Sequence, residues 1–449
     1  MFQRILIANR GEIAVRIIRA CRDLCIESVV VYSEADHDAM PTRLADTAIC
    51  IGPPPAAKSY LNMPAIMAAA EVSDAEAIHP GYGFLAENAD FAEICIETDL
   101  AWIGPPPAAM RAMGDKVIAK NRMRAAGVPT VPGSDNAIAS VDDAKQSSKD
   151  IGFPVIVKAA AGGGGRGMKI VHSEAAVISA FMMAQSEAAA AFGDDTVYIE
   201  KYLEKPRHIE VQILADRFGN VVHLFERECS MQRKNQKVLE EAPSPFLDQE
   251  TRQIICRAGV TAAKAVNYVG VGTVEFLVNP DKSFYFIEMN TRIQVEHPVT
   301  EAITGIDLVE WQIRTAAGER LPFSQVDIHM RGHAIECRIN AEHPYKFTPS
   351  PGTIDLYHPP GGRNVRVESA VYSGYTITPY YDSMIGKIIV QGSDRPQAIR
   401  TMQQAMDELV VSGVQTNKEL HQRLLANPAF QEGRFNIHFL ENWLKQMNL

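Results

Sequence analysis

Residues 288–301 read Glu288-Met-Asn-Thr-Arg-Ile-Gln-Val-Glu-His-Pro-Val-Thr-Glu301 and follow a run typical of a buried strand, Phe284-Tyr-Phe-Ile287. Every second residue from Glu288 to Glu296 is polar, and alternate residues of a strand share one face. Eight extended residues span roughly 26 Å at about 3.3 Å each, so we expect the chain to bend near Asn290. Taken alone, the run would fit a solvated edge strand. If these charged side chains are instead buried next to the preceding strand, each needs a partner of opposite charge or a bound ion, because an unpaired buried charge is costly.

A second strand is expected just upstream, at Gly272-Thr-Val-Glu-Phe-Leu-Val278, and Asn279-Pro-Asp-Lys-Ser283 between the two has the composition of a turn. If Asn279 pairs with Phe284, Glu275 lies opposite Glu288 with Cβ atoms roughly 5 Å apart, although a register shift of two residues stays open. Like charges repel at that distance. Mg2+ removes the repulsion, because it binds one or two protein carboxylates together with water and phosphate oxygens. The sequence therefore predicts a magnesium–nucleotide site at Glu275 and Glu288.

A glycine-rich segment follows a third predicted strand. Phe153-Pro-Val-Ile-Val-Lys-Ala159 reads as a buried strand that ends near Lys158, and Ala160-Ala-Gly-Gly-Gly-Gly-Arg-Gly-Met168 comes next. Consecutive glycines cost backbone entropy on folding, so they do not serve stability. Their bare N–H groups suit a mobile flap that closes over phosphate oxygens. The pattern is neither a Walker loop nor a GxGxxG fingerprint, and the alternative is a flexible linker.

Composition limits the classes of function. A chain of 449 residues is long enough for about three domains. The net charge of −10 and the absence of a basic run argue against a nucleic-acid partner. No apolar run approaches about 18 residues, so no membrane span is expected, and the strand pattern at the amino end argues against a signal peptide. Seven cysteines without a CxxC pair indicate reduced thiols in a cytoplasmic protein, with Cys21 and Cys25 one helical turn apart and facing the core.

The first segment, residues 1–114, alternates strand and helix patterns, which predicts a doubly wound α/β unit with a parallel sheet. Its expected strands lie at 4–8, 28–32, 77–78 and 101–103, with a helix from about Glu12. Asn9-Arg-Gly-Glu12 stands where a dinucleotide-binding domain has GxGxxG, so that role is not expected. The glycine- and aromatic-rich loop His79–Asn88 either approaches a ligand or is an ordered structural loop.

Two further segments complete the chain. Residues 115–330 contain the lysines, the glycine run and the carboxylate hairpin, and residues 331–449 read as a third α/β segment. The expected elements are an antiparallel hairpin of 208–214 and 221–225 about the turn Arg217–Asn220, a strand within 331–340, and helices at 395–409 and 417–425.

Six segments spread over the chain carry a family resemblance. They are Asn9-Arg-Gly-Glu-Ile13, His79-Pro-Gly-Tyr-Gly-Phe-Leu-Ala-Glu-Asn88, Lys158 with its glycine run, Gln236-Lys-Val-Leu-Glu-Glu-Ala-Pro243, residues 288–301 and Glu336-Cys-Arg-Ile-Asn-Ala-Glu342. Together they resemble biotin carboxylase, most closely the stand-alone bacterial subunit of acetyl-CoA carboxylase. The resemblance implies an ATP-grasp enzyme, α/β (α+β overall), with a Rossmann-like N-terminal domain, a central ATP-grasp domain with a mobile lid, and a C-terminal biotin carboxylase domain. The corresponding ranges are 1–114, 115–330, about 131–203 for the lid, and 331–449.

The resemblance also implies a nucleotide site. Its residues would be Lys116, Lys158, Gly162, Gly163, Gly164, Gly165, Met168, Glu200, Lys201, Leu203, His208, Gln232, Asn235 and Leu277. Within that set the two lysines would hold phosphates, because ammonium groups do so readily. The backbone from Glu200 to Leu203 would take the adenine, and His208 and Gln232 the ribose. Asn235 stands where close relatives often have histidine, and an amide can still bond a ribose hydroxyl.

The remaining implied residues belong to the reaction itself. Two ions, Mg2+ or Mn2+, would be held by Glu275, Glu288 and Asn290, bicarbonate by Lys237, Arg292, Gln294 and the Val295 backbone, and biotin by Tyr82 and Arg338. The catalytic set would be Glu296, Arg292, Arg338 and Lys237. Glu296 would remove the bicarbonate proton so that the anion attacks the γ-phosphate. Arg338 would stabilise the biotin enolate oxygen, on which charge develops only as the reaction proceeds.

The resemblance implies partners as well. No Ala-Met-Lys-Met biotinylation motif occurs in the chain, so biotin is expected on a separate carrier protein, with carboxyltransferase subunits and a homodimer as further partners. The same chemistry could serve a propionyl-CoA, pyruvate or 2-oxoglutarate carboxylase, because the acceptor is chosen elsewhere. A silent nucleotide-binding subunit, or a ligase that joins a carboxylate to an amine, would not need the intact bicarbonate and biotin residues.

Overall fold

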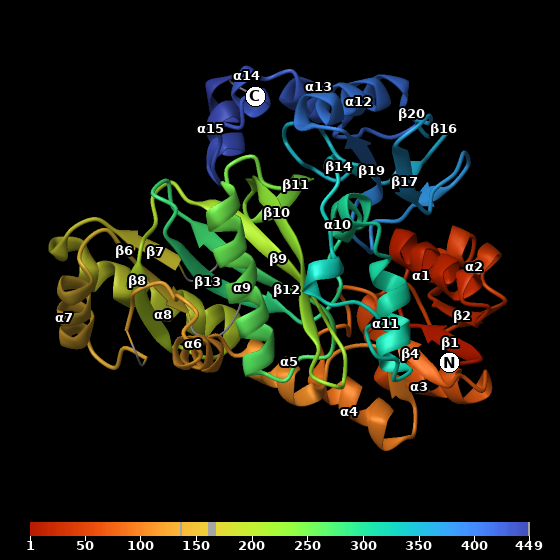
Figure 1. Ribbon diagram of the computed structural model, residues 1–449, viewed down its shortest axis with the longest axis horizontal. Helices are drawn as coiled ribbons and strands as arrows, with labels where there is room; N and C mark the ends of the chain where they lie inside the picture. The colour runs from red at the N-terminus through yellow and green to blue at the C-terminus, as the bar shows by residue number, and fades with distance from the viewer. Residues whose placement is uncertain (135–136, 160–167, 448–449) are drawn as a thin grey trace.

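A computed structural model describes residues 1–134, 137–159 and 168–447, and its amino-terminal part is the parallel sheet that the sequence predicts (Figure 1). This N-terminal sheet has the order β3-β2-β1-β4-β5, and its neighbouring strands are parallel. Its strands are β1 (Arg4–Ile7), β2 (Glu27–Tyr32), β3 (Thr47–Cys50), β4 (Ala77–His79) and β5 (Ala101–Trp102). The sequence pattern does not predict β3, because Thr47-Ala-Ile-Cys50 is short and half small residues.

Helices pack on both faces of this sheet, which makes it doubly wound as expected. Ile5 and Ile7 of β1 lie in one core with Ile13, whereas the intervening Leu6 lies in another core with Ile66. Alternate residues of a strand point to opposite faces, so one strand supplies both cores. The helices of this part are α1 (Gly11–Asp23), α2 (Met40–Leu44), α3 (Met63–Val72), α4 (Ala89–Glu97) and α5 (Pro107–Gly114).

The second sheet, here the central sheet, crosses the expected segment boundary at residue 330. Its order is β13-β12-β9-β10-β11-β14-β19-β17, and neighbouring strands are antiparallel. Four register pairs from Leu239–Cys337 to Ala242–Ala334 join β11 to β14, so the carboxyl-terminal segment extends this sheet rather than forming its own. The strands are β9 (Arg207–Ala215), β10 (Val221–Arg233), β11 (Gln236–Ala242), β12 (Gly270–Val278), β13 (Phe284–Asn290), β14 (His333–Asn340), β17 (Val365–Ser369) and β19 (Met384–Gly392).

The carboxylate hairpin forms with one correction to its register. Val278, not Asn279, pairs with Phe284, because the Asn279 N–H donates to the Ser283 carbonyl and closes a shorter turn. The register then shifts by one residue between Phe276 and Glu275, which places Glu275 opposite Glu288 as predicted. A bulge adds one residue to one strand, and here it restores the predicted pair. The strand ends at Asn290, where the chain was expected to bend.

A small sheet with its own core stands beside the central sheet. This lid sheet has the order β7-β6-β8 and comprises β6 (Val155–Ala159), β7 (Met168–Val171) and β8 (Val197–Lys201). Helices α7 (Val141–Ile151) and α8 (Val177–Phe192) flank it, and their apolar residues share a core with Val155 and Val157. In Figure 1 this lobe projects at the left, away from the carboxyl-terminal helices. Helix α6 (Lys116–Ala125) precedes it in the chain.

The remaining helices cover the central sheet or close the chain. They are α9 (Gln249–Ala265), α10 (His297–Thr304), α11 (Leu308–Ala316), α12 (Arg395–Glu408), α13 (Lys418–Leu425), α14 (Pro428–Gln431) and α15 (Phe439–Gln446). Two pairs of short strands, β15 (Gly352–Thr353) with β18 (Thr376–Ile377) and β16 (Leu356–His358) with β20 (Val410–Ser412), complete the carboxyl-terminal part. Helices α12 and α13 match the predicted ranges to within one residue.

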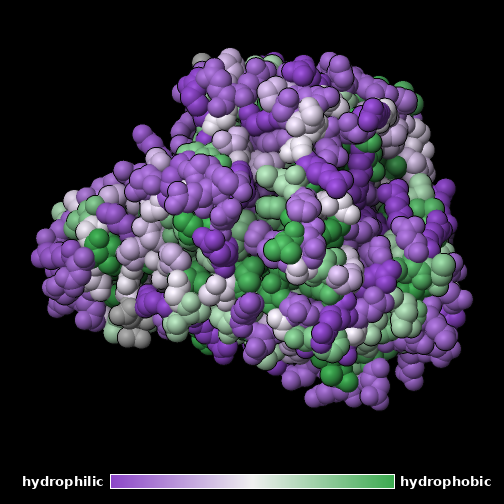
Figure 2. Space-filling model, viewed as in Figure 1, coloured by the Kyte–Doolittle hydropathy of each residue, from purple (hydrophilic) through white to green (hydrophobic). Residues whose placement is uncertain are grey.

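The thiols and the helices agree with what the composition predicts, apart from the burial of one cysteine. Hydrophilic residues cover most of the face shown in Figure 2. Among the described residues, no helix combines the length and the apolar character needed to cross a bilayer. All seven cysteines are free, as expected. Cys21 is buried, but Cys25 is exposed, because α1 ends at Asp23 and Cys25 adopts a positive φ of 59° beyond the helix.

Candidate active site

A cavity of about 1,010 Å3 lies between the lid sheet, the central sheet and the segment that follows β13. Its walls come from elements distant in sequence, from helix α6 to the loops around Asn417. Most of the predicted site residues line it: Lys116, Lys158, Met168, Glu200, Lys201, Leu203, His208, Gln232, Asn235, Lys237, Glu275, Leu277, Glu288, Asn290, Arg292, Gln294, Val295, Glu296 and Arg338. The predicted flap residues Gly162, Gly163, Gly164 and Gly165 lie outside the described residues.

The paired carboxylates lie in the wall of this cavity. The Nδ2 group of Asn290 donates to Oε1 of Glu275 at 2.9 Å, so three of the expected metal ligands are adjacent. Burial raises the pKa of Glu288, and the charge of Glu275 raises it further. Burial also favours a raised pKa at Glu275, but Lys237 and His208 outweigh it and hold that pKa well below its ordinary value. The carboxylates of Glu275 and Glu288 offer the oxygen ligands that a hard divalent cation such as Mg2+ or Mn2+ prefers. The Asn290 amide turns its NH2 group to Glu275 and its oxygen to Arg292, so it would have to rotate to offer a ligand oxygen.

A second group of ligand atoms overlaps this one. His208, Glu210 and Glu275 offer atoms that lie within 4.8 Å of one another. The carboxylate of Glu210, however, accepts hydrogen bonds from Lys237 Nζ and Arg227 Nε, both at 2.5 Å. Glu275 has partners of the same kind, Lys237 and His208. The cation site is therefore distinguished by Glu288, whose pKa is raised by burial and by the charge of Glu275.

Glu296 lies at the far side of the cavity between two cations. Its Oε1 accepts from Lys237 Nζ at 2.6 Å and its Oε2 from Arg338 Nη2 at 2.9 Å. Burial would raise its pKa, but Lys237, Arg338 and Arg227 hold that pKa well below its ordinary value. Glu296 is therefore ionised, as a general base must be. Arg338 also donates from Nε to Glu240 at 2.6 Å, which fixes its plane beside Glu296.

The opposite end of the cavity gathers lysines. Lys158 Nζ lies 2.6 Å from Glu200 Oε2, and Lys120 forms an ion pair with the other oxygen of the same carboxylate. Burial, together with the charge of neighbouring lysines, lowers the pKa of Lys158 to about 8 and that of Lys120 to about 6. Because these lysines crowd one carboxylate, this end of the cavity suits a polyanion such as a nucleotide phosphate chain, whose charge would favour their protonated form.

Lys120 is a site residue that the sequence reasoning missed. It lies four residues after Lys116 on α6, a spacing that places both side chains on one helix face. That spacing was a usable signal. Its ammonium also lies 4.7 Å from the centre of the Tyr198 ring, in the same cavity.

Two of the expected nucleotide residues have side chains with a second function, and a third lies in a tight turn. The carboxylate of Glu200 bridges two lysines, which leaves its backbone for a ligand. Lys201 donates to the carbonyls of Gly152 and Phe153, so its ammonium supports the lid sheet. Asn235 lies in the turn between β10 and β11 with a φ of 64°, a conformation that asparagine tolerates better than most residues.

The loop His79–Asn88 is ordered and reaches the site through Glu87. Asn9 Nδ2 donates to the carbonyls of Pro80 and Tyr82, both at 2.7 Å, which fixes the loop against β1. Glu87 accepts from Arg292 Nε at 2.9 Å. Arg292 is thus held at the cavity wall from the N-terminal part.

Tyr82, the second residue expected to contact biotin, uses its hydroxyl in a contact within the protein. It is not among the residues that line the cavity, and its hydroxyl donates to Glu12. The same carboxylate of Glu12 pairs with the fully buried Lys387 at 3.1 Å, and Lys387 donates to the Val295 carbonyl at 2.5 Å. Tyr82 is therefore connected to the cavity wall through Glu12 and Lys387. Burial raises the pKa of its hydroxyl well above the ordinary value, and the charge of Arg338 in that wall acts in the opposite direction. A lysine inside the apolar run Met384–Val390 was the sequence signal for this chain of contacts.

Comparisons with known proteins agree along the whole chain. Family models described as "Biotin carboxylase, N-terminal domain", "Carbamoyl-phosphate synthase L chain, ATP binding domain" and "Biotin carboxylase C-terminal domain" match residues 1–110, 115–324 and 336–442. The biotin carboxylase of Nostoc sp. is 56% identical over 445 residues, which covers 99% of this chain and 100% of that protein.

Two solved structures are similar in fold and sequence. A biotin carboxylase–beta-gamma-ATP complex from Campylobacter jejuni has a TM-score of 0.95 and 52% identity, covering 98% of this chain and 99% of that one. The biotin carboxylase domain dimer of Hydrogenobacter thermophilus 2-oxoglutarate carboxylase, with MgADP, ADP and bicarbonate, has a TM-score of 0.93 and 50% identity, covering 98% of each chain. This chain therefore belongs to the biotin carboxylase family, and it has the ATP-grasp fold and the ATP-dependent ligase chemistry of that family.

Proposed function

We propose that this chain uses ATP and bicarbonate to carboxylate biotin on a separate carrier protein, as the first half-reaction of an acetyl-CoA carboxylase. The observation that carries the proposal is the position of Glu296. An ionised carboxylate between Lys237 and Arg338 shares one cavity with a lysine-rich end suited to phosphates. A protein that only binds nucleotide has no use for that arrangement.

The nucleotide would occupy the end of the cavity beside the lid sheet. Lys116 and Lys158 would hold its phosphates, with Lys120 as a further cation. The backbone from Glu200 to Leu203 would take the adenine, and His208, Gln232 and Asn235 the ribose side. Met168 and Leu277 also line this end of the cavity and would pack on the base.

The acidic hairpin would hold the metal. Glu275 and Glu288 would supply carboxylate oxygens of the kind that Mg2+ and Mn2+ prefer, and two ions per site are expected. Asn290 would supply its amide oxygen after turning it away from Arg292. When bound, the metal neutralises charge on the nucleotide phosphates. It also relieves the repulsion that raises the pKa of Glu288.

The chain's own residues would organise bicarbonate chemistry at the other end. Lys237, Arg292, Gln294 and the Val295 backbone would cradle the anion. Glu296 would take its proton, so that the bicarbonate oxygen attacks the γ-phosphorus and the bond to the leaving ADP breaks. The products of that step are carboxyphosphate and ADP.

Biotin carboxylation would follow in the same cavity. Carboxyphosphate separates into CO2 and phosphate, the phosphate removes the proton from N1 of biotin, and the N1 lone pair attacks CO2. Arg338 would stabilise the negative charge on the ureido oxygen, because it lies beside Glu296 with a guanidinium that always carries charge. Exclusion of water would protect carboxyphosphate from hydrolysis.

The partners of the chain follow from this proposal. Biotin would arrive on a carrier protein, and a carboxyltransferase subunit would choose the acceptor. The Hydrogenobacter thermophilus domain belongs to a 2-oxoglutarate carboxylase, so a keto-acid carboxylase is the specific alternative to an acetyl-CoA carboxylase. That domain is also described as a dimer, which favours a homodimer here. We further propose a cytoplasmic location, where bacterial fatty-acid precursors are made.

The test is bicarbonate-dependent ADP release with magnesium-ATP, measured with and without free biotin. In the wild type, biotin should stimulate ADP release. Glu296→Ala should reduce stimulated turnover by about 100-fold or more, because general-base catalysis contributes at least that factor. Glu319→Ala is the matched control, since that carboxylate is partly exposed and pairs with Arg314 away from the cavity.

Each result leads to a different conclusion. Stimulation that collapses only in Glu296→Ala supports both the activity and the base. ATP binding without stimulated turnover in the wild type would instead identify a silent nucleotide-binding subunit. Turnover that survives in Glu296→Ala would keep the enzyme and remove Glu296 from the mechanism.

A further inference from the structure

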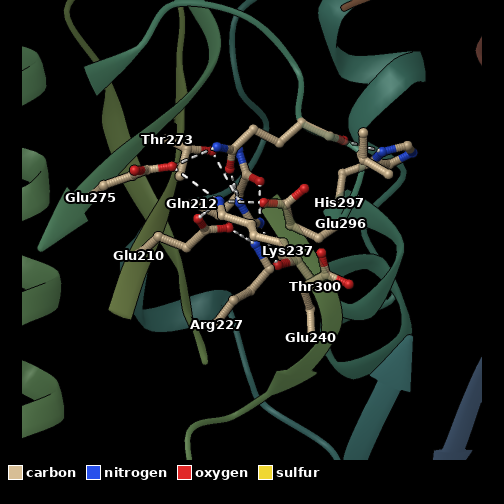
Figure 3. Close-up of polar contacts among 12 residues, drawn as sticks. Glu210, Gln212, Arg227, Lys237, Glu240, Thr273, Glu275, Glu296, His297 and Thr300 are labelled. Atoms are coloured by element: carbon tan, nitrogen blue, oxygen red, sulfur yellow. Dashed lines mark hydrogen bonds and ion pairs between the residues drawn. The ribbon is translucent and has the colours of Figure 1, made fainter. Parts of the chain in front are cut away.

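Arg227 is a fully buried arginine of β10 whose five N–H groups all have an acceptor (Figure 3). Figure 3 shows it beneath the cluster of Glu210, Lys237 and Glu296. Its acceptors are Glu210 Oε1 at 2.5 Å, Gln212 Oε1 at 2.5 Å, Thr300 Oγ1 at 2.9 Å, Thr273 Oγ1 at 3.0 Å and Gln294 Oε1 at 2.9 Å.

These acceptors come from separate parts of the fold. Glu210 and Gln212 lie on β9, Thr273 lies on β12, Thr300 lies on α10, and Gln294 lies in the segment between β13 and α10. A guanidinium has a rigid planar fork of donors, so it fixes the relative positions of all of them. Arg227 therefore ties the segment that carries Gln294 to two strands of the central sheet.

The contact with Gln294 sets the orientation of its amide. A guanidinium donates hydrogen bonds and accepts none, so the amide must turn its oxygen toward Arg227. Its NH2 group then points to the opposite side, where Nε2 donates to Glu275 Oε1 at 2.9 Å in the cavity wall. A reversed amide would bring its NH2 group against the N–H groups of Arg227.

This orientation matters for an anion. Bicarbonate needs N–H donors around it, and a reversed amide would offer it an oxygen lone pair instead. The single charge of Arg227 is balanced by Glu210, which also accepts from Lys237 at 2.5 Å. Arg227 thus holds two residues of the expected bicarbonate site, Gln294 directly and Lys237 through Glu210. Its own side chain does not line the cavity.

We propose that Arg227 is a positioning residue for bicarbonate, which acts by holding the Gln294 amide with its NH2 group toward the anion. The proposal rests on the proposed function, because it assigns a task within the bicarbonate site. A lysine at position 227 would keep the charge beside Glu210. Its three rotatable donors could not serve the same acceptors in one plane.

The experiment is a double-mutant cycle between Arg227→Lys and Gln294→Ala, read as KM for bicarbonate and KM for ATP. Arg227→Lys should raise the KM for bicarbonate about tenfold or more, as expected for losing a charge-assisted contact, and change the KM for ATP by about twofold or less. In the Gln294→Ala background, Arg227→Lys should add little further effect, because its target is gone. Additive effects in the two backgrounds would overturn the proposal.

Two further variants separate positioning from general stability. Arg252→Lys removes the fork of another buried arginine, which donates to Glu226 and to the Ser244 and Leu247 carbonyls. It should lower the melting temperature and leave the KM for bicarbonate unchanged. Thr300→Val removes one acceptor of Arg227 and is mild enough to fold, and it should raise the KM for bicarbonate by a smaller factor than Arg227→Lys.

The outcomes separate the two proposals. Without bicarbonate-dependent ADP release in the wild type, the proposed function itself fails. With that activity present, an unchanged KM for bicarbonate in both Arg227→Lys and Thr300→Val overturns the positioning role alone. A rise in the KM for bicarbonate in Arg252→Lys as large as in Arg227→Lys would also overturn it, because loosened packing would then explain the effect.

Discussion

Nζ of Lys237 lies 2.6 Å from Oε1 of Glu296, and the two side chains form the base end of the cavity. Burial works against both charges, but three carboxylates raise the pKa of Lys237 well above its ordinary value, and Lys237 in turn holds the pKa of Glu296 well below its own. The proton therefore stays on the lysine. Glu296 is ready to accept a proton from a substrate over the whole neutral range.

Lys237→Met should shift the acid side of the pH–rate profile to higher pH. A base acts in its ionised form, and loss of the cation raises the pKa of Glu296, so the variant should lose activity at a pH where the wild type is still active. The shift in the profile of kcat/KM for bicarbonate should be about one unit or more. Lys149→Met, which removes an exposed partner of Glu174 on the lid, should leave the profile unmoved. An unshifted profile in Lys237→Met would mean that Lys237 does not control the base.

Stability should fall as pH rises because of Glu240. Glu240 lies opposite Glu336 across β11 and β14, and neither oxygen of Glu336 has a hydrogen-bond partner in the described structure. Burial raises the pKa of Glu240 from 4.5 to about 7 and raises the pKa of Glu336 well above its ordinary value, despite Arg338 and Lys387 nearby. A raised carboxyl pKa means that the folded state binds protons more tightly than the unfolded state. The stabilisation is thus complete below the unfolded pKa of 4.5 and is lost as pH rises through about 7.

Glu240→Gln tests that linkage directly. An amide is close in shape and carries no titrating proton, so the variant's melting temperature should decline less between about pH 5 and about pH 8 than that of the wild type. Glu228→Gln is the matched comparison, because Glu228 is equally buried and pairs with Arg207 in the same sheet. Parallel melting curves for wild type and Glu240→Gln across that pH range would exclude Glu240 as the titrating group.

The acidic hairpin could be predicted from the sequence because all of its signals are local. Two strand patterns and one turn were enough to place Glu275 opposite Glu288, although the turn was one residue shorter than expected and a bulge restored the pair. The same reasoning fails for the continuity of the central sheet. The pairing of Leu239 with Cys337 joins strands nearly a hundred residues apart, and no local pattern states which strands are neighbours.

The parts of the site that were missed share one physical cause. Lys387 lies inside an apolar strand, and Arg227 is buried between Glu226 and Glu228 in β10. Burial of a charge signals a partner without saying which one. Their partners Gln294 and Val295 lie far away in sequence. The contact between Tyr82 and Glu12 likewise joins residues that are distant in sequence, so no local pattern states it.

Gly332→Ala should destabilise the join between the central sheet and its carboxyl-terminal strands. Gly332 has a φ of 70°, and a Cβ there would lie 2.2 Å from the backbone oxygen of Gly392, which cannot move without breaking the pair with His333. We expect a loss of about 2–3 kcal/mol, from strain and collision together. Gly127→Ala separates the two effects, since its φ is 78° but nothing lies within 4 Å. The melting temperature should fall more for Gly332→Ala than for Gly127→Ala. An equal fall in both would show that the backbone at Gly392 moves away from the added Cβ at no cost, which contradicts the prediction.

Glu288→Gln should raise the magnesium requirement without abolishing nucleotide binding. An amide keeps the shape and one oxygen but loses the charge that attracts a divalent cation. The free Mg2+ concentration that gives half-maximal ADP release should therefore rise by about tenfold or more. Glu342→Gln provides the control, because Glu342 is a buried carboxylate of the same cavity that is not an expected metal ligand. Its Mg2+ requirement should match that of the wild type.

Direct titration with Mn2+ gives an independent measurement, and the affinity for Mn2+ should drop in Glu288→Gln alone. An equal drop in both variants would mean that the general negative charge of the cavity, and not the pair of Glu275 and Glu288, attracts the ion.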